Sequence, residues 1–295
     1  MRSKKIFDII TLFFSLSYLA IFLLFLFELA INSQLTWKMY GFQFIIGTRW
    51  DPNKNIFGAL PFIYGTIVTS ALSLALSFPI GIGTAIFLSE VIDQRISELL
   101  TEVIELIAGI PSVVIGLWGI FYLVPFVKNF LEPMLSCLSF IPLFSSQGVS
   151  GLSVMSAILV LSFMITPFIA VTTKSALDSV PEDLKEAMYS LGAHKYEVIT
   201  YVSLPYIKKA IVSGTMLAFG RAFGETMAVT MVIGNMPTIA LSLFSPGYTI
   251  PAVIANELTE AIAQLHISSL IFLALILEIM SITTIFVERL IIRKW

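Results

Sequence analysis

The chain alternates between long apolar stretches and short polar connections. Charge-free apolar stretches occupy about residues 9–27, 55–89, 106–127 and 152–171, and two more with a few embedded charges occupy about 210–233 and 262–287. A bilayer core of roughly 30 Å needs about 20 apolar residues per crossing helix. The pattern therefore predicts six transmembrane helices and an all-α, polytopic membrane protein.

Composition supports a protein immersed in lipid. Of the 295 residues, 57% are hydrophobic and 12% are charged, whereas an average soluble domain is roughly 25% charged. This excludes an ordinary soluble enzyme and a disordered chain. The net charge of -2 provides no basic field for a nucleic-acid partner. With Cys137 as the single cysteine, an intrachain disulfide and a cysteine metal cluster are excluded, and His194 and His266 lack neighbours at metal-ligand spacing.

The first apolar stretch has two interpretations. Arg2, Lys4 and Lys5 precede it, as in a signal peptide. However, the stretch is longer than the usual apolar region of such a peptide, and the residues after it, 28–31, make a poor cleavage site. We therefore expect a retained helix.

Lys and Arg residues are distributed unequally between the two sets of connections. With the N-terminus inside, the inner side carries twelve of the 17: Arg2, Lys4, Lys5, Arg95, Lys174, Lys185, Lys195, Lys208, Lys209, Arg289, Arg293 and Lys294. The outer side carries four, Lys38, Arg49, Lys54 and Lys128. Because Lys and Arg accumulate in cytoplasmic loops, both termini are predicted to be cytoplasmic.

The first inner connection, residues 90–105, predicts an amphipathic helix. Apolar residues recur at helical spacing, and Glu and Asp form most of the polar side. A bend is expected near Gly109-Ile110-Pro111. The helix either lies along the bilayer surface or, given its acidity, meets a protein partner.

The second inner connection, residues 172–209, predicts two short helices. Ser179-Val180-Pro181-Glu182 fits a capping box, an apolar face follows, and Gly192 lies where a left-handed cap is expected. A second helix, about 195–202, ends before Leu204-Pro205. The result is a cytoplasmic helix–turn–helix, with a hairpin lying on the membrane surface as the alternative.

This connection resembles the cytoplasmic signature of the membrane subunits of bacterial ABC importers. That signature reads Glu-Ala-Ala, three residues, Gly, nine residues, then Ile-x-Leu-Pro. The chain keeps the spacing with Glu186-Ala187-Met188, Gly192 and Val202-Ser203-Leu204-Pro205. It departs from the pattern at Met188 and Val202.

Three further segments narrow the resemblance. Residues 219–229 (FGRAFGETMAV), residues 79–85 (PIGIGTA) and Trp50-Asp51-Pro52 resemble C-type permease subunits of phosphate-specific ABC importers. This resemblance implies the type I ABC importer permease fold. It implies one transmembrane domain over residues 1–295, with a core at about 60–290 and a coupling segment at 172–209.

The resemblance also implies an assembly in a bacterial cytoplasmic membrane. The expected partners are a second, A-type permease, a dimeric cytosolic ATPase and an extracytoplasmic phosphate-binding protein. The chain has no Gly-x-x-x-x-Gly-Lys-[Ser/Thr] loop, so ATP and Mg²⁺ are expected on the ATPase and no cofactor or metal on this chain. The residues expected to couple to the ATPase are Glu186, Ala187, Gly192, Leu204 and Pro205. The Gly81 and Gly83 pair is interpreted as close helix packing.

Arg221 and Glu225 are embedded charges in the fifth predicted span. Spaced four apart on one helix, they are expected to share a face and touch. Because a charge at the bilayer centre costs roughly 2.5–3.5 kcal/mol, such a residue is expected to face a polar path or a partner. One hypothesis makes Arg221 a waypoint for phosphate, held by Glu225. The alternative is a structural salt bridge. The role of Glu278, in the sixth span, stays open.

Three other functions remain as alternatives. The first is an importer of the same architecture for molybdate or sulfate. The second is a secondary transporter driven by an ion gradient, for which inverted repeats and several buried acidic residues are expected. The third is an intramembrane enzyme, which the sequence disfavours because no catalytic motif is recognisable.

Overall fold

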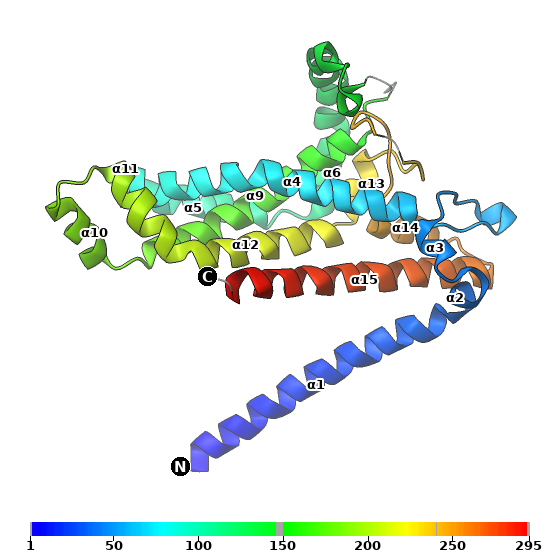
Figure 1. The fold of residues 1–295 in the computed structure, drawn as a ribbon, viewed down its shortest axis with the longest axis horizontal. Helices are drawn as coiled ribbons and strands as arrows, with labels where there is room; N and C mark the ends of the chain where they lie inside the picture. Colours follow the sequence, from blue (N-terminus) through cyan, green and yellow to red (C-terminus); the bar gives the residue numbers. More distant parts are fainter. Residues whose placement is uncertain (1, 146–149, 240, 294–295) are drawn as a thin grey trace.

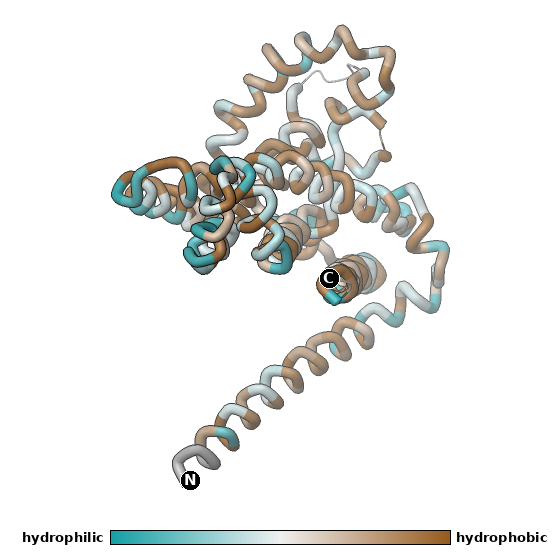
Figure 2. The backbone as a smooth tube through the Cα atoms, turned by 60° about the vertical axis from the view of Figure 1, so that its left-hand side comes forward, coloured by the Kyte–Doolittle hydropathy of each residue, from teal (hydrophilic) through white to brown (hydrophobic). Residues whose placement is uncertain are grey.

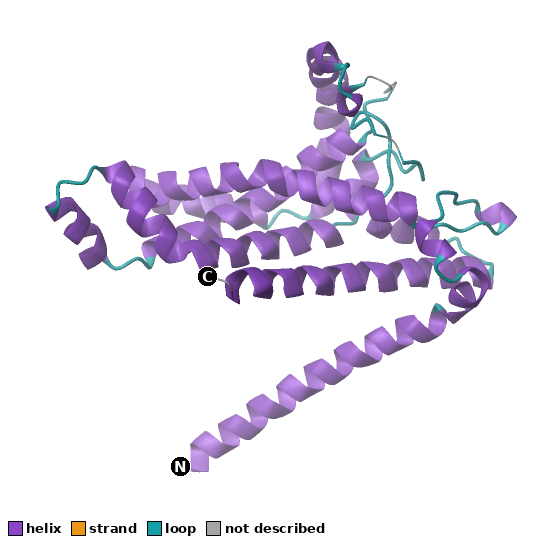
Figure 3. Ribbon diagram, viewed as in Figure 1, coloured by secondary structure: helices purple, strands orange, loops and turns teal. Residues whose placement is uncertain are grey.

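The computed structural model describes residues 2–145, 150–239 and 241–293, with side chains from residue 7 onward, and within these ranges it is dominated by helices (Figure 3). Its longest helices are α1 (Arg2–Asn32), α4 (Leu60–Ile86), α9 (Val154–Asp178), α12 (Leu204–Gly224) and α15 (Gln264–Arg293). Residues 133–151, which are rich in proline, serine and glycine, predict a loop before the fourth apolar stretch, and of these residues 146–149 lie outside the described ranges.

Four of these helices form a bundle. α4, α9, α12 and α15 lie side by side with roughly aligned axes, whereas α1 diverges and meets the bundle only near its C-terminal end (Figure 1). From Phe7 onward, most apolar side chains of α1 are exposed. Figure 2 shows the hydrophobic character of this helix by its colour. A lone helix with such a surface is suited to lipid or to another apolar helix rather than to water.

Five helical segments within the described residues are long and apolar enough to cross a membrane. They are Phe7–Asn32, Leu60–Val91, Ser112–Leu138, Val154–Asp178 and Gln264–Arg293. The predicted fifth crossing, 210–233, is not among them. α12 carries Lys208, Lys209 and Arg221, and it ends at Gly224, before the short α13 (Met227–Val232). The prediction of one unbroken helix over 210–233 is therefore wrong, although α12 lies alongside the other bundle helices.

The third crossing also differs from the prediction. The amphipathic helix is α5 (Gln94–Ala108), which ends at Gly109 as expected, and the apolar helix begins anew with α6 (Ser112–Trp118). It then continues to Leu135, where a loop was expected, and stands away from the bundle in Figure 1. Its later parts are η3 (Gly119–Leu123), α7 (Val124–Phe126), η4 (Val127–Leu131) and α8 (Glu132–Leu135).

π-helical turns explain how this helix passes two prolines. η3 ends just before Val124-Pro125 and η4 ends just before Glu132-Pro133, while η7 (Ile199–Ser203) ends before Leu204-Pro205. Proline lacks an N–H donor, and its ring clashes with the carbonyl four residues earlier. A widened turn moves that carbonyl away, so the helix continues where the prolines alone predict a break.

Serine side chains and a glycine join α4 to α9. Ser73 Oγ donates to the Ile158 carbonyl and Ser77 Oγ to the Ser162 carbonyl, each at 3.0 Å, and all three serines are buried. A Cβ on Gly81 would lie 2.7 Å from Ile169 Cγ2, so only glycine allows this approach. The close-packing interpretation is confirmed for Gly81, whereas Gly83 faces open space.

One end of the bundle is a second packed unit. It is built from α2 (Gln34–Tyr40), α3 (Gln43–Ile46), η1 (Pro52–Lys54) and α14 (Ile250–Glu257) (Figure 1). Here Trp50 Nε1 donates to Glu257 Oε2, and His266 Nε2 lies 2.9 Å from the same oxygen. Phe57 stacks on the imidazole. His266, which has no neighbours at metal-ligand spacing in the sequence, is a buried member of this polar cluster.

The opposite end of the bundle carries a projecting helix–turn–helix. We call it the elbow, formed by α10 (Glu182–Ser190), α11 (Lys195–Val198) and η7. The beginning of α1 and the end of α15 are directed toward this end in Figure 1. The remaining short elements are η2 (Phe87–Val91), η5 (Ser136–Leu138) and η6 (Pro142–Phe144).

Candidate functional site

The elbow matches the predicted pair of helices but not the predicted cap. Ser179 Oγ donates back to the Ala176 carbonyl at 2.6 Å, at the end of α9, and Pro181 is the N-cap residue of α10. The capping box expected at Ser179–Glu182 is therefore wrong, because the hydroxyl serves the preceding helix. Glu197 caps α11 instead, accepting from the His194 N–H at 2.6 Å.

Gly192 provides the turn between the two elbow helices. Its φ is +85°, in the left-handed region, and its N–H donates to the Tyr189 carbonyl at 2.9 Å. The left-handed cap predicted at this position is confirmed. A Cβ at Gly192 would meet nothing within 4 Å, so the requirement for glycine comes from the backbone conformation and not from space.

Several signature residues of the elbow are exposed on the surface of the molecule. Glu186 and Ala187 are exposed, and so is most of the predicted apolar face, with Leu184 at 42% and Leu191 at 84% exposure. Leu204 is half-buried and begins α12, and Pro205 lies in the first helical turn, where its missing donor does no harm. Exposed apolar residues on so short a helix need a partner surface to be stable in water.

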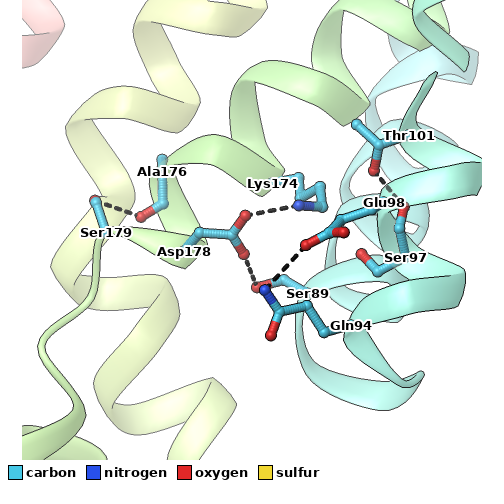
Figure 4. A network of polar contacts seen from close by, with 9 residues as sticks. All are labelled: Ser89, Gln94, Ser97, Glu98, Thr101, Lys174, Ala176, Asp178 and Ser179. Atoms are coloured by element: carbon cyan, nitrogen blue, oxygen red, sulfur yellow. Dashed lines mark hydrogen bonds and ion pairs between the residues drawn. The ribbon is translucent and has the colours of Figure 1, made fainter.

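A polar network joins η2 to the end of α9, just before the chain enters the elbow (Figure 4). Ser89 Oγ of η2 donates to Asp178 Oδ1 at 2.7 Å, and Lys174 Nζ pairs with Asp178 Oδ2 at 2.7 Å. Asp178 is the last residue of α9, so this contact joins the ends of α9 and of the Leu60–Val91 segment. Nearby, α5 packs on α9 through the side that carries buried Ser97, leaving apolar Ile96 and Leu99 exposed.

Arg221 lies in an open groove between α12 and α15. The groove has a volume of about 650 Å³, and its lining includes Phe168, Ser213, Arg221, Ser281, Thr284 and Glu288. The Arg221 guanidinium lies over the Phe168 ring, 4.4 Å from its centroid, and the side chain is exposed to the groove. A cation over an aromatic face is stabilised without losing its charge, so it can still attract an anion.

Glu225 does not share a helix face with Arg221. α12 ends at Gly224, and the Glu225 backbone is extended, with φ −70° and ψ 121°. Its Oε1 accepts from the Ala228 N–H at 3.3 Å at the start of α13. The predicted contact between Arg221 and Glu225 is therefore wrong, because glycine weakens the helix end and the carboxylate is better placed at the positive end of the next helix.

Sequence reasoning missed Glu288, which lines the groove with Arg221. A signal was present: Ser281, Thr284 and Glu288 follow one another at helical spacing along α15 and form a polar stripe in an apolar span. Glu278 lies half-buried in the same helix and is not part of the groove lining.

Comparison with known sequences gives strong matches. Residues 77–295 match the family described as binding-protein-dependent transport system inner membrane component. The chain is 43% identical over 255 residues to the phosphate transport system permease protein PstC of Mesorhizobium japonicum, covering 85% of this chain and 78% of that protein. It is 37% identical to PstC of Haemophilus influenzae over 99% of this chain and 93% of the relative.

Solved structures share the fold at low identity. An inward-facing MetNI methionine ABC transporter matches with a TM-score of 0.60 and 16% identity, over 79% of this chain and 94% of that one. A bacterial alginate ABC transporter, in complex with a periplasmic protein bound to alginate pentasaccharide, matches with a TM-score of 0.57 and 20% identity, over 94% and 93%. These likenesses establish the arrangement of helices.

Proposed function

The chain belongs to the family of binding-protein-dependent transport system inner membrane components, and we propose that it is the membrane permease subunit of an ATP-driven phosphate importer. The observation that carries the proposal is its 37% identity to a phosphate transport permease over 99% of its length. The transported ion is thus inferred from sequence similarity. The arrangement of helices agrees with that of a solved ABC transporter.

Phosphate import needs an energy source that this chain lacks. Moving an anion toward a negative interior costs about 2.3 kcal/mol per charge per 100 mV. The sequence has no phosphate-binding loop of the P-loop type. We infer that a dimeric cytosolic ATPase binds and hydrolyses ATP with Mg²⁺, and that this chain supplies the path and the docking surface.

The elbow is the proposed docking surface for the ATPase. Glu186 and Ala187 lie on its exposed side, Gly192 sets its turn, and Leu204 and Pro205 join it to α12. The exposed Leu184 and Leu191 side chains suit an apolar groove on a protein partner. This favours the coupling role over a hairpin that has no partner.

Arg221 is the proposed cationic waypoint of the path. It is the basic residue of the groove, and serine and threonine hydroxyls lie around it. Glu225 contributes by fixing the start of α13, directly after the Arg221 helix. The groove with Arg221 is open on one side, so a second protein surface is needed to enclose the path. We assign that surface to a homologous A-type permease.

The proposed arrangement in the bacterial cytoplasmic membrane follows from charge and shape. The elbow and both termini are placed in the cytoplasm, where most of the Lys and Arg residues fall. The unit with Trp50 and His266 then lies outside and receives the phosphate-binding protein. α12 serves as the sixth crossing, with Lys208 and Lys209 near the inner interface.

Uptake by the reconstituted complex tests this function. Liposomes containing this chain, the second permease and the ATPase, supplied with the binding protein, are expected to accumulate phosphate only with ATP. Unlabelled phosphate should compete, whereas molybdate and sulfate should not. Uptake that persists without the ATPase indicates a secondary transporter, and competition by molybdate or sulfate reassigns the cargo.

The waypoint is tested by Arg221→Gln. We expect the complex to assemble normally and uptake to fall to background, because the cation that attracts phosphate is gone. Lys209→Gln, an exposed lysine on the same helix, is the matched control and should leave uptake intact. Normal uptake by Arg221→Gln contradicts the path role.

A further inference from the structure

One helix of the elbow is anchored by a lysine. Of the nine residues of α10, only Lys185 is buried. The apolar cluster at the base of the elbow, Ala85, Leu177, Val180 and Ile207, joins α4, α9 and α12 and contains no residue of α10. The main packing contacts of α10 are with its neighbours α11 and η7, so a polar attachment to the bundle matters for its position.

That attachment is a buried ion pair between Lys185 and Glu90. Lys185 Nζ lies 3.0 Å from Glu90 Oε1, and the two side chains are 11% and 7% exposed. Glu182 also pairs with Lys185, at 3.3 Å, but it is 75% exposed and belongs to α10 itself. Charges shielded from water attract more strongly than exposed ones, so Glu90 is the stronger link.

Lys185 is charged at neutral pH. Burial by itself lowers its pKa, but the carboxylates of Glu90 and Glu182 outweigh burial, and the pKa is raised above the ordinary value of 10.5. Since a raised pKa keeps the ammonium group protonated through the physiological range, Lys185 carries its positive charge there.

Glu90 connects this pair to the transmembrane bundle. It lies in η2, the π-helical turn that ends the Leu60–Val91 segment. The neighbouring residue, Ser89, makes the hydrogen bond to Asp178 at the end of α9 (Figure 4). Two adjacent residues of one turn therefore hold α9 on one side and α10 on the other.

The helix that carries Glu90 is tied to the far end of the molecule. α4 is joined to α9 by the Ser73 and Ser77 hydrogen bonds. Near its outer end, Thr66 Oγ1 accepts from the Ile250 N–H at 2.9 Å, where α14 begins. A displacement imposed on α10 thus has a continuous hydrogen-bonded route to the outer unit.

We propose that Lys185, through Glu90, is the positioning residue that converts movement of the elbow into movement of α4. This inference rests on the proposed function, in which an ATPase moves the elbow. Docking and transmission are then separate: the exposed side of α10 binds the ATPase, and its buried side holds α4.

The test measures docking, hydrolysis and uptake in the same complex. Lys185→Met and Glu90→Gln should retain the ATPase at wild-type stoichiometry and raise the ATP hydrolysed per phosphate imported about fivefold or more. Lys185→Arg keeps the charge and should keep the ratio near that of the wild type. Glu182→Gln is the matched control, since it removes a carboxylate that links α10 only to itself, and it should leave the ratio unchanged.

Two results overturn the inference. One is a normal ratio in Lys185→Met with normal assembly. The other is loss of ATPase binding in parallel with uptake, which indicates a purely structural pair. Wild-type complexes that lack ATP-dependent uptake instead contradict the proposed function, so the two failures are distinguishable.

Discussion

At the scale of single residues, conformation and charge set what the elbow does. Gly192 is needed for a left-handed backbone with open space around it. Lys185 is needed for its charge in a buried place, where removing one partner of an ion pair typically costs about 3–5 kcal/mol. The first requirement was visible in the sequence. The second was hidden, because Glu90 is far from Lys185 along the chain.

Substitutions at Gly192 test whether this position requires a left-handed backbone conformation or a small side chain. Gly192→Pro should lose the ATPase in co-purification, because proline fixes φ near −65° and cannot adopt the observed +85°. Gly192→Asn should keep it, since asparagine tolerates the left-handed region. Equal ATPase recovery from the two variants contradicts a conformational role for this turn.

At the scale of elements, close backbone approaches decide how the helices pack. A Cβ on Gly65 of α4 would lie 2.1 Å from the Tyr248 carbonyl oxygen, in the loop before α14. The loop is held there by the Thr66 contact with Ile250. π-helical turns before Pro125, Pro133 and Pro205 show the complementary device, in which a helix widens to accept a proline.

The close approach at Gly65 makes a stability prediction. Gly65→Ala should destabilise the chain by about 1–3 kcal/mol, because carbonyl oxygen and methyl group cannot occupy the same space. Gly83→Ala, in the same helix with nothing within 4 Å, is the control and should be neutral or stabilising. Thermal unfolding in detergent measures both, and similar melting temperatures for the two variants contradict the prediction.

At the scale of the whole molecule, the two ends of the bundle differ in structure. One end carries the elbow and the other carries the unit that contains Trp50, Glu257 and His266 (Figure 1). Between them lie the groove with Arg221 and the serine-linked α4 and α9. This separation is what an importer needs if energy arrives at one face and cargo at the other.

Labelling from the two sides of the membrane tests this separation. In a Cys137→Ser background, Ser190→Cys in the elbow should react with a membrane-impermeant maleimide only from the cytoplasmic side. Asn53→Cys in the outer unit should react only from the opposite side, and both positions are exposed. Labelling of both from one side would refute the proposed topology.

The sequence by itself determined the class of the protein, the number of long apolar segments to within one, and the turn at Gly192. These depend on local properties: hydropathy over 20 residues, helical spacing and the backbone freedom of glycine. The sequence also predicted the amphipathic helix before Gly109, but it did not predict which side of that helix is buried.

Only the tertiary structure decided where the charges meet. The helix of the fifth span ends at Gly224, which separates Glu225 from Arg221. Glu288 lies in the groove with Arg221. His266 is buried beside Glu257, and Lys185 pairs with Glu90. The physical reason is that a charge in an apolar setting is stabilised by whichever partner the fold brings near. Sequence spacing predicts such a partner only when one unbroken helix carries both residues.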